Sequence, residues 1–329
     1  MNAAAQAFAL AQAGRPGDAL ALLRTAASGG DGTALFALAL WRIEGKLLER
    51  DLPQARGELA RAAALGEPLA ARALAALLAA GVGGERDWSA ALHLLERHKN
   101  QDEEAGGQLQ LIAAMRLDEA GDPMSLPEPE ILSRDPLVVR HTGLFTPAEC
   151  LYLRQIAERR FAPALIFHEG RQCFVADPLR TSETASFPFI SEWPAVHALN
   201  RRLAAASGSD VRQGEPLQVL RYTPGQEYRP HLDAIPGLGN QRVLTFLVYL
   251  SDDYEGGETD FPELPLRFRG ALGTGLLFGN ALPDGRPDPR MRHAGLPVRS
   301  GSKLVASRWI RARPPAQGDS FGRHEVERQ

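Results

Sequence analysis

The 329-residue chain is poor in cysteine, and neither sign of charge dominates it. Two cysteines, Cys150 and Cys173, are too few for a disulfide framework, so we expect reduced thiols and a cytoplasmic protein. The chain carries 37 basic and 40 acidic residues, a formal net charge of -3. A surface that neutralises many phosphates usually has a strong basic excess, so we expect no nucleic-acid partner.

Long apolar runs are also missing from the chain. No stretch of 18 uninterrupted apolar residues is present, so we expect no transmembrane helix and no membrane partner. The alanine-rich start lacks a basic segment before its apolar run, which makes a signal peptide the less favoured interpretation. The apolar share of 44% and the charged share of 23% indicate a folded protein, and the length predicts about two domains.

Alanine is abundant but unevenly distributed. Residues 1–120 hold 32 alanines, whereas all later residues together hold 18. Residues 34–66 recur as residues 70–102 at an offset of 36, with Gly45 aligned on Gly81. Small residues at helical spacing let paired helices pack closely, and the glycines end one helix before the next. A period in the thirties therefore predicts stacked helical hairpins, an α-solenoid; an alanine-rich bundle without repeats is the alternative.

The repeated stretch resembles Sel1-like repeats, which are relatives of the tetratricopeptide repeats. The expected role is binding a protein or peptide partner, or bracing the domain that follows. We place this repeat domain at residues 1–118 and a proline-rich linker at residues 119–137. A second domain is expected at residues 138–313, followed by a polar tail at residues 314–329.

Helix signals near the start of the second domain give way to strand signals. Thr146 and Glu149 have the spacing of a capping box, which predicts a helix from there to about Arg160. A second helix is expected near residues 193–206, and alternating β-branched runs follow it.

Metal-ligating residue types fall in these predicted strands. His231 and Asp233 lie two residues apart, so their side chains project from one face of a strand. His293 follows 60 residues after Asp233, and Lys303 follows ten residues later. Two histidines and one carboxylate leave half of an octahedral iron open, whereas three ligands and a water also describe catalytic zinc. Lys303 favours iron, because a cation is needed to hold the distal carboxylate of 2-oxoglutarate.

Several ordered segments resemble the prolyl 4-hydroxylases of the Fe(II)/2-oxoglutarate superfamily. They are EPLQVLRYTPGQEYRPHLD at residues 215–233, RVLTFLVYL at residues 242–250, GGETDFP at residues 256–262, DGRPD at residues 284–288, and the run from His293 to Arg311. The resemblance covers roughly residues 138–313. It implies a double-stranded β-helix, a jelly-roll barrel with flanking helices, following the N-terminal α-helical repeats.

The resemblance also assigns the site residues by position. The iron ligands are implied to be His231, Asp233 and His293. Lys303 is implied to pair with the C5 carboxylate of 2-oxoglutarate, helped by the hydroxyls of Tyr222 and Thr245. The residues expected on the substrate side are Tyr228, Arg180, Ser182, Gln218, Arg242 and Trp309.

The implied activity is hydroxylation of a prolyl residue, at C4, in a peptide or protein. Fe(II) is the implied cofactor, 2-oxoglutarate and O2 are the co-substrates, and ascorbate is left open as a further cofactor. Two alternatives are a hydroxylase of a free amino acid or small natural product, and a non-catalytic module that senses 2-oxoglutarate or oxygen. A third, demethylation of nucleic-acid bases, is disfavoured because those relatives hold 2-oxoglutarate with arginine and carry basic faces. Here the residues after 120 hold 25 bases and 25 acids.

Overall fold

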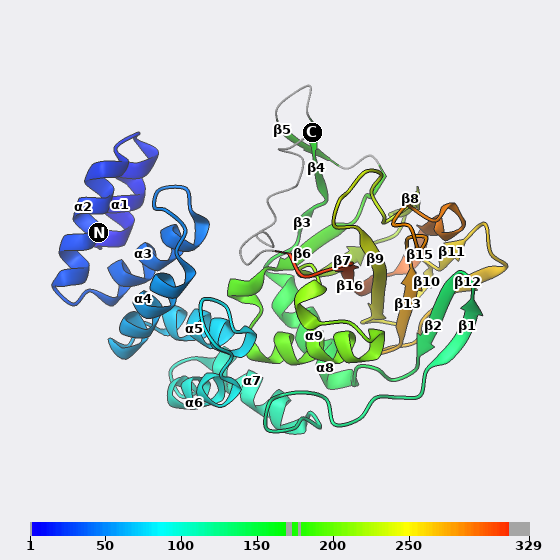
Figure 1. The fold of residues 1–329 in the computed structure, drawn as a ribbon, viewed down its shortest axis with the longest axis horizontal. Coiled ribbons are helices and arrows are strands. Elements are labelled where there is room, and N and C mark those ends of the chain that lie inside the picture. The colour runs from blue at the N-terminus through cyan, green and yellow to red at the C-terminus, as the bar shows by residue number, and fades with distance from the viewer. Residues whose placement is uncertain (1, 169–172, 177–178, 316–329) are drawn as a thin grey trace. The chain divides into compact units, whose positions relative to one another are not determined.

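The fold is that of a computed structural model, which describes residues 2–168, 173–176 and 179–315. The described chain separates into two compact units. The first unit contains residues up to 124 together with residues 189–198, and the second contains residues 125–188 and the chain from residue 199. Helices dominate the first unit and antiparallel strands dominate the second (Figure 1).

The first unit consists of α-helical hairpins. Its helices are α1 (Ala3–Gln12), α2 (Pro16–Ser28), α3 (Gly32–Glu44), α4 (Leu52–Ala64), α5 (Pro68–Ala80), α6 (Trp88–His98) and α7 (Glu103–Ala114). Helices α2, α4 and α6 begin at residues 16, 52 and 88, so the predicted interval of 36 recurs at each step. Asp51 and Asp87 cap α4 and α6 with their side chains. Gly45 and Gly81 end α3 and α5 at φ values of 69° and 71°, a region that side chains other than glycine disfavour.

Buried alanines show why the hairpins pack closely. The buried alanines of α3 recur at equivalent positions of α5, where Ala34, Ala37 and Ala39 correspond to Ala70, Ala73 and Ala75. The α-helical repeat architecture expected from the sequence is therefore confirmed. Residues 189–198, which include the 3-10 turn η2 (Phe189–Ser191), belong to this unit. There the side-chain oxygen of Gln108 accepts a hydrogen bond from the Ala195 amide at 3.4 Å, and the Arg72 guanidinium lies 5.2 Å from the centroid of the Trp193 ring.

The second unit is built on two main antiparallel sheets. The larger sheet has the spatial order β1 (Glu130–Arg134), β2 (Leu137–His141), β13 (Gly275–Gly279), β9 (Arg242–Tyr249), β16 (Lys303–Arg311), β7 (Leu217–Tyr222), β6 (Glu183–Phe187) and β3 (Ala162–Pro163). The smaller sheet has the order β12 (Leu266–Phe268), β11 (Thr259–Phe261), β14 (His293–Gly295) and β8 (Tyr228–His231). Further pairs join β10 (Tyr254–Gly256) to β15 (Val298–Gly301), and β4 (Leu165–His168) to β5 (Cys173–Ala176).

A shared hydrophobic core joins the two sheets. Phe261 and Phe268 of the smaller sheet are buried in one cluster with Tyr249, Phe278 and Val305 of the larger sheet. Several neighbouring strands, such as β2 and β13 or β16 and β7 in the larger sheet and β14 and β8 in the smaller one, are far apart in sequence, as in a jelly roll. The double-stranded β-helix expected for this part of the chain is confirmed.

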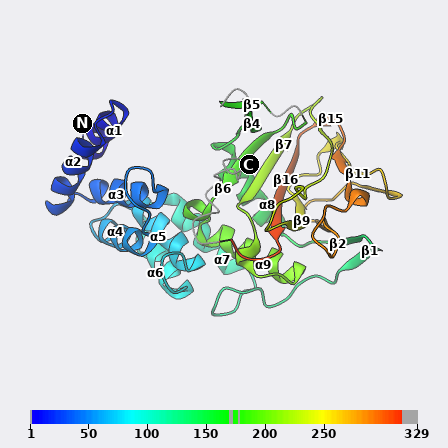
Figure 2. The same cartoon turned by 45° about the horizontal axis from the view of Figure 1, so that its top comes forward.

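Helices cover the outer face of the larger sheet (Figure 2). Helix α8 (Pro147–Glu158) contacts β6 and β7, and it begins at the predicted capping box of Thr146 and Glu149. Glu149 is 1% exposed, and its two carboxylate oxygens also accept hydrogen bonds from Arg202 of α9 (Pro194–Ser207) at 2.7 and 2.8 Å. The buried carboxylate of Glu149 thus caps α8 and also ties α9 to it through Arg202. The 3-10 turns η3 (Val211–Gln213) and η4 (Pro289–Met291) complete the unit.

Two sequence expectations outside the site can be compared with the structure. Strand β1 lies inside residues 119–137, which were expected to form a linker; Pro129 and Pro136 flank this strand without interrupting it, so it can pair with β2. Within the described residues, no helix combines the length and the hydropathy needed to cross a membrane.

Candidate metal centre

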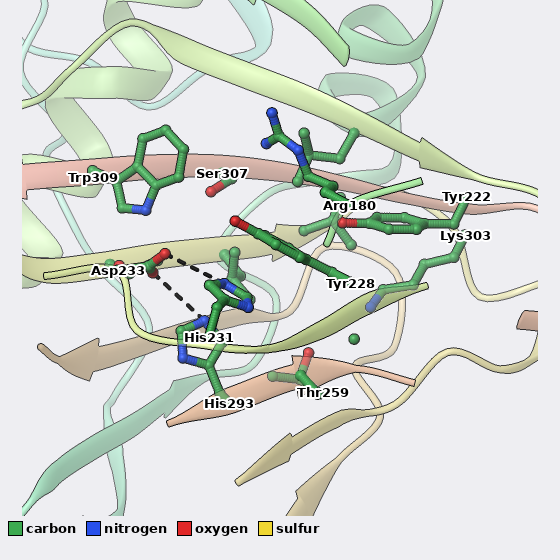
Figure 3. Close-up of a pocket in the computed structure, with 16 residues that line it drawn as sticks. Arg180, Tyr222, Tyr228, His231, Asp233, Thr259, His293, Lys303, Ser307 and Trp309 are labelled. Carbon is green, nitrogen blue, oxygen red and sulfur yellow. Dashed lines mark hydrogen bonds and ion pairs between the residues drawn. The ribbon is translucent and has the colours of Figure 1, made fainter. Parts of the chain in front are cut away.

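Strand pairing brings the three expected metal ligands together. In the ladder between β8 and β14, His231 stands opposite His293, and Asp233 lies just beyond the end of β8. The Nε2 atom of His231 is 3.5 Å from Oδ1 of Asp233, and Nε2 of His293 is 3.6 Å from Oδ2 (Figure 3). One ligand atom from each residue lies within 4.8 Å of the other two, a spacing that can hold a single metal ion.

Both imidazoles are held in the tautomer that a metal requires. Nδ1 of His231 lies 2.8 Å from the carbonyl oxygen of Arg229, and Nδ1 of His293 lies 2.9 Å from that of Met291. A carbonyl oxygen can only accept, so Nδ1 carries the proton and donates it. Each Nε2 therefore presents a lone pair toward Asp233, which is how ligating histidines are usually oriented.

Asp233 stays ionised although it is buried. Burial alone would raise its pKa, but the neighbouring imidazoles of His293 and His231 and a hydrogen bond from Thr245 hold the pKa well below its ordinary value. Burial also lowers the pKa of His293, although nearby Asp233 acts in the opposite direction. Two imidazoles and one carboxylate are the donor set of a non-haem iron site, so the residues present fit an iron ion.

A pocket with about 480 Å³ of empty space, partly open to solvent, extends from the triad between the two sheets. Strand alternation explains its walls, because every second residue of a strand faces the same side. On β16 the lining residues are Lys303, Val305, Ser307 and Trp309. Strand β7 contributes Leu220 and Tyr222, and β9 contributes Thr245 and Leu247.

Lys303 lies at the other end of this pocket from the metal ligands (Figure 3). Its side chain is 4% exposed, and burial lowers its pKa to about 8, although nearby Glu258 acts in the opposite direction. The Nζ atom lies 5.4 Å from the centroid of the Tyr222 ring and 5.6 Å from that of Tyr249. Among the described residues, no carboxylate forms a salt bridge with Lys303. A buried ammonium in such surroundings fits the carboxylate of a bound ligand.

Two hydroxyl residues near Lys303 were not found from the sequence. Tyr249 is fully buried, and its hydroxyl lies 2.7 Å from that of Thr259, which lines the pocket. Burial raises the pKa of Tyr249 well above its usual value, so the phenol stays protonated. The motif GGETDFP contains Thr259, but only the pairing of β11 with β14 places this residue beside Lys303. Tyr249 and Thr259 therefore add two hydroxyl groups to the Lys303 end of the pocket, where Tyr222 also lies.

Thr245 lies at the metal end of the pocket, not at the Lys303 end. Its Oγ1 donates to Oδ2 of Asp233 at 2.6 Å and accepts from Nδ2 of Asn280 at 2.8 Å. The expectation that Thr245 assists Lys303 therefore does not match its position, because its single proton already points to Asp233. Asn280 gave no recognisable signal in the sequence.

The residues expected on the substrate side fall into two groups. Tyr228, Arg180 and Trp309 line the pocket, and the Tyr228 ring stacks on His231 with centroids 3.5 Å apart and an interplanar angle of 16°. The Arg180 guanidinium lies 5.5 Å from the centroid of the Tyr228 ring. The indole nitrogen of Trp309 is buried and has no hydrogen-bond partner among the described residues.

Ser182, Gln218 and Arg242 are not among the described residues that line the pocket. Arg242 is engaged elsewhere: it forms hydrogen bonds to both carboxylate oxygens of Glu215, at 2.7 and 2.9 Å, and its guanidinium lies 3.9 Å from the Trp309 ring centroid. Ser182 is 1% exposed, inside the protein. Arg242 therefore lies behind Trp309, from where its charge also acts on Asp233 and Tyr228 of the pocket.

These features place the second unit in the class of Fe(II)/2-oxoglutarate oxygenases with a double-stranded β-helix, and the sequence profile of the 2OG-Fe(II) oxygenase superfamily matches residues 217–311. Prolyl 4-hydroxylase 1 of Arabidopsis thaliana is 34% identical over 203 residues, which cover 56% of this chain and 72% of that protein. The chain belongs to the prolyl 4-hydroxylase family.

Two solved structures are also similar to parts of the chain. The viral collagen prolyl hydroxylase from Paramecium Bursaria Chlorella virus-1, solved with 2-oxoglutarate, is 30% identical, covers 54% of this chain and 96% of its own, and has a TM-score of 0.44. A Sel1 repeat protein from Oxalobacter formigenes is 30% identical, covers 28% of this chain and 70% of its own, and has a TM-score of 0.27.

Proposed function

We propose that this protein hydroxylates a prolyl residue, at C4, in a peptide or protein substrate, with Fe(II), 2-oxoglutarate and O2. The observation that carries the proposal is one pocket with a His-Asp-His triad at one end and a buried lysine at the other. A zinc hydrolase would need the triad but would have no use for Lys303. Membership of the prolyl 4-hydroxylase family supports the choice of a prolyl substrate.

One end of the pocket would bind the metal, and the other would bind the distal carboxylate of 2-oxoglutarate. His231, Asp233 and His293 would hold the iron, and Lys303 would bind the C5 carboxylate of 2-oxoglutarate. When bound, the iron supplies the oxidising chemistry that converts 2-oxoglutarate and O2 to succinate and CO2 while hydroxylating a C–H bond. Leu220, Leu247 and Val305 line the space between, and their apolar side chains suit the two methylene groups of 2-oxoglutarate.

The mouth of the pocket would receive the target proline. Tyr228 and Trp309 offer aromatic faces on which a pyrrolidine ring can pack, and Arg180 lies against the Tyr228 ring. The backbone of Arg180 and its neighbours pairs with the strand that carries Tyr228: the Thr181 amide donates to the Glu227 carbonyl at 3.1 Å, and the Arg229 amide donates to the Leu179 carbonyl at 2.8 Å. These backbone hydrogen bonds would fix the residues around Arg180 next to the metal ligands, where an extended substrate peptide could bind.

The N-terminal repeats would bind a protein, either the substrate itself or a partner that delivers it. Stacked helical hairpins present extended surfaces suited to this use. Cytoplasmic location is part of the same proposal, supported by the low cysteine count and by the free, buried thiol of Cys150.

The test is 2-oxoglutarate turnover with and without Fe(II), followed as succinate formation. The wild type should require Fe(II), and Asp233→Ala should lose turnover because the charged ligand is gone. Asp260→Ala is the matched control, since Asp260 is a carboxylate of the same sheet that pairs with Arg267 outside the pocket. Turnover that survives in Asp233→Ala, or needs no Fe(II), contradicts the assignment.

The substrate class needs a separate measurement. The Asp233→Ala protein should retain proteins that the active enzyme modifies, and mass spectrometry of these proteins after wild-type treatment should show one added oxygen on proline. Oxidation of free proline or of another small amino acid, with no oxygen gained by any peptide, would instead support the small-molecule alternative.

A further inference from the structure

Asp233 is held by a hydrogen-bonded pair of residues from the larger sheet. Thr245 lies in β9, and Asn280 lies just beyond the end of β13, the strand that pairs with β9. Both residues are 1% exposed. Water does not reach this pair, so its hydrogen bonds are not exchanged for bonds to solvent.

The donor and acceptor groups of the Asn280 and Thr245 side chains fix the direction of both hydrogen bonds that lead to Asp233. Nδ2 of Asn280 can only donate, so Oγ1 of Thr245 accepts at that contact, which is 2.8 Å long. The threonine hydroxyl has a single proton, and the remaining contact is Oδ2 of Asp233 at 2.6 Å. The backbone of Asn280 is itself fixed, because its amide donates to the Val243 carbonyl at 2.9 Å and its carbonyl accepts from Asp288 at 3.0 Å.

The consequence concerns one carboxylate oxygen. The Thr245 proton binds Oδ2, whereas Oδ1 faces Nε2 of His231. A carboxylate with one oxygen held in this way cannot rotate freely about its terminal bond. It therefore offers the other oxygen to a metal in a set direction and leaves fewer ways to occupy two coordination positions.

We propose that Thr245 and Asn280 are positioning residues that set the metal affinity of the site by holding Asp233 in a single orientation. The inference rests on the proposed function, because it assumes that the triad binds a metal. Partners of this kind, which contact a ligand but not the metal, typically change metal affinity by roughly 10- to 100-fold when they are removed.

The experiment measures metal binding directly, by titration of the metal-free full-length protein with Co(II) and by its visible absorption spectrum. Thr245→Val keeps the shape of the side chain and removes the hydroxyl, so the Co(II) dissociation constant should rise roughly 10- to 100-fold. Thr245→Ser restores the hydroxyl and should return the constant to near its original value. The apparent KM for 2-oxoglutarate should change much less than that for Fe(II), since Lys303 is untouched.

A second variant and a control separate positioning from stability. Asn280→Ala frees the Thr245 hydroxyl to rotate, so it should weaken metal binding less than Thr245→Val, and the double variant should be no worse than Thr245→Val alone. Thr184→Val is the matched control: it removes a buried threonine hydroxyl from β6 of the same sheet, and that hydroxyl has no hydrogen-bond partner in the described chain. Its Co(II) constant should match that of the wild type.

The outcomes distinguish the two proposals. If the wild type binds no Co(II), the proposed metal centre itself is wrong. If the wild type binds Co(II) and Thr245→Val binds it equally well with the same spectrum, only the positioning role is overturned. A Thr245→Val protein that melts earlier but keeps wild-type metal affinity also overturns it, because the hydroxyl would then serve stability alone.

Discussion

Replacing Lys303 with methionine should stabilise the protein and weaken its binding of 2-oxoglutarate. The buried ammonium has a pKa near 8, lowered from 10.5 by loss of hydration. That difference of about 2.5 units corresponds to roughly 3 kcal/mol of free energy spent on keeping the group charged in the folded protein at neutral pH. Methionine has a similar length and carries no charge, so it avoids this cost without opening a cavity.

The sign of the pH dependence follows from the same pKa. Between pH 8 and 10.5 the unfolded chain still holds the lysine proton and the folded protein has lost it, so the free energy of unfolding should rise with pH in this window. Below pH 8 the Lys303 amine is protonated in both the folded and the unfolded state, so it adds no pH dependence to the free energy of unfolding. The free energy of unfolding of the Lys303→Met variant should not rise in this window. The excess stability of the variant over the wild type should therefore shrink from up to about 3 kcal/mol at pH 7 to near zero at pH 10.5.

Urea unfolding at several pH values measures the stability, and anaerobic titration with 2-oxoglutarate and Mn(II) measures the affinity. Loss of a charge-assisted contact should weaken 2-oxoglutarate binding by roughly 10- to 100-fold. In the wild type, affinity should also fall as the pH rises through 8, because the neutral amine no longer attracts a carboxylate. Lys46→Met, at an exposed lysine of the first unit, is the control and should change stability by less than about 0.5 kcal/mol.

Two results would refute this reasoning. The first is a Lys303→Met protein that is no more stable than the wild type at pH 7, together with a wild-type stability that stays flat from pH 8 to 10. The ammonium would then be hydrated and not desolvated. The second is unchanged 2-oxoglutarate affinity in the variant, which would place the co-substrate elsewhere.

Two further substitutions test contacts away from the metal. Arg202→Met leaves the buried carboxylate of Glu149 unpaired, so urea unfolding should show a loss of about 3–5 kcal/mol; an unchanged midpoint would mean that the ion pair carries no stability. Gly257→Ala should weaken 2-oxoglutarate binding in a calorimetric titration, because φ is +64° there and a Cβ atom would lie 3.1 Å from Cδ of Lys303. Gly285→Ala, also at positive φ but with open space around it, is the control, and equal losses in both variants would show that backbone strain alone is responsible.

The metal ligands could be predicted from the sequence because their chemistry is rare and their spacing is regular. His231 and Asp233 share a strand face by alternation alone, and the segment around His293 has few alternative explanations. Lys303 was identifiable because it follows His293 by ten residues and because a cation is needed to hold the distal carboxylate of 2-oxoglutarate.

The hydroxyl residues were harder to place because the residue type alone does not show which end of the pocket a threonine or tyrosine faces. Thr245 and Tyr249 lie four residues apart on β9, yet one reaches Asp233 and the other lies near Lys303. Only the pairing of β9 with β13 and β16 decides which end of the pocket each one faces. Asn280 likewise depends on this register and cannot be recognised before the strands are paired.

Arg242 illustrates a different limit. A positive charge near a predicted pocket suggests a ligand contact, but Glu215 lies 27 residues earlier and binds the guanidinium through both oxygens. Ion pairs between distant segments compete with functional roles for the same side chain. A sequence pattern does not show which of the two a charged residue serves.

The assignment of residues 189–198 to the first unit has a practical consequence for limited proteolysis. The polypeptide passes between the two units three times, at residues 124/125, 188/189 and 198/199. A protease that cuts once within residues 119–124 would sever only the first of these passages. The larger fragment would still contribute residues 189–198 to the helical unit, so the nicked protein should elute in gel filtration as one particle and separate into two fragments only in denaturant.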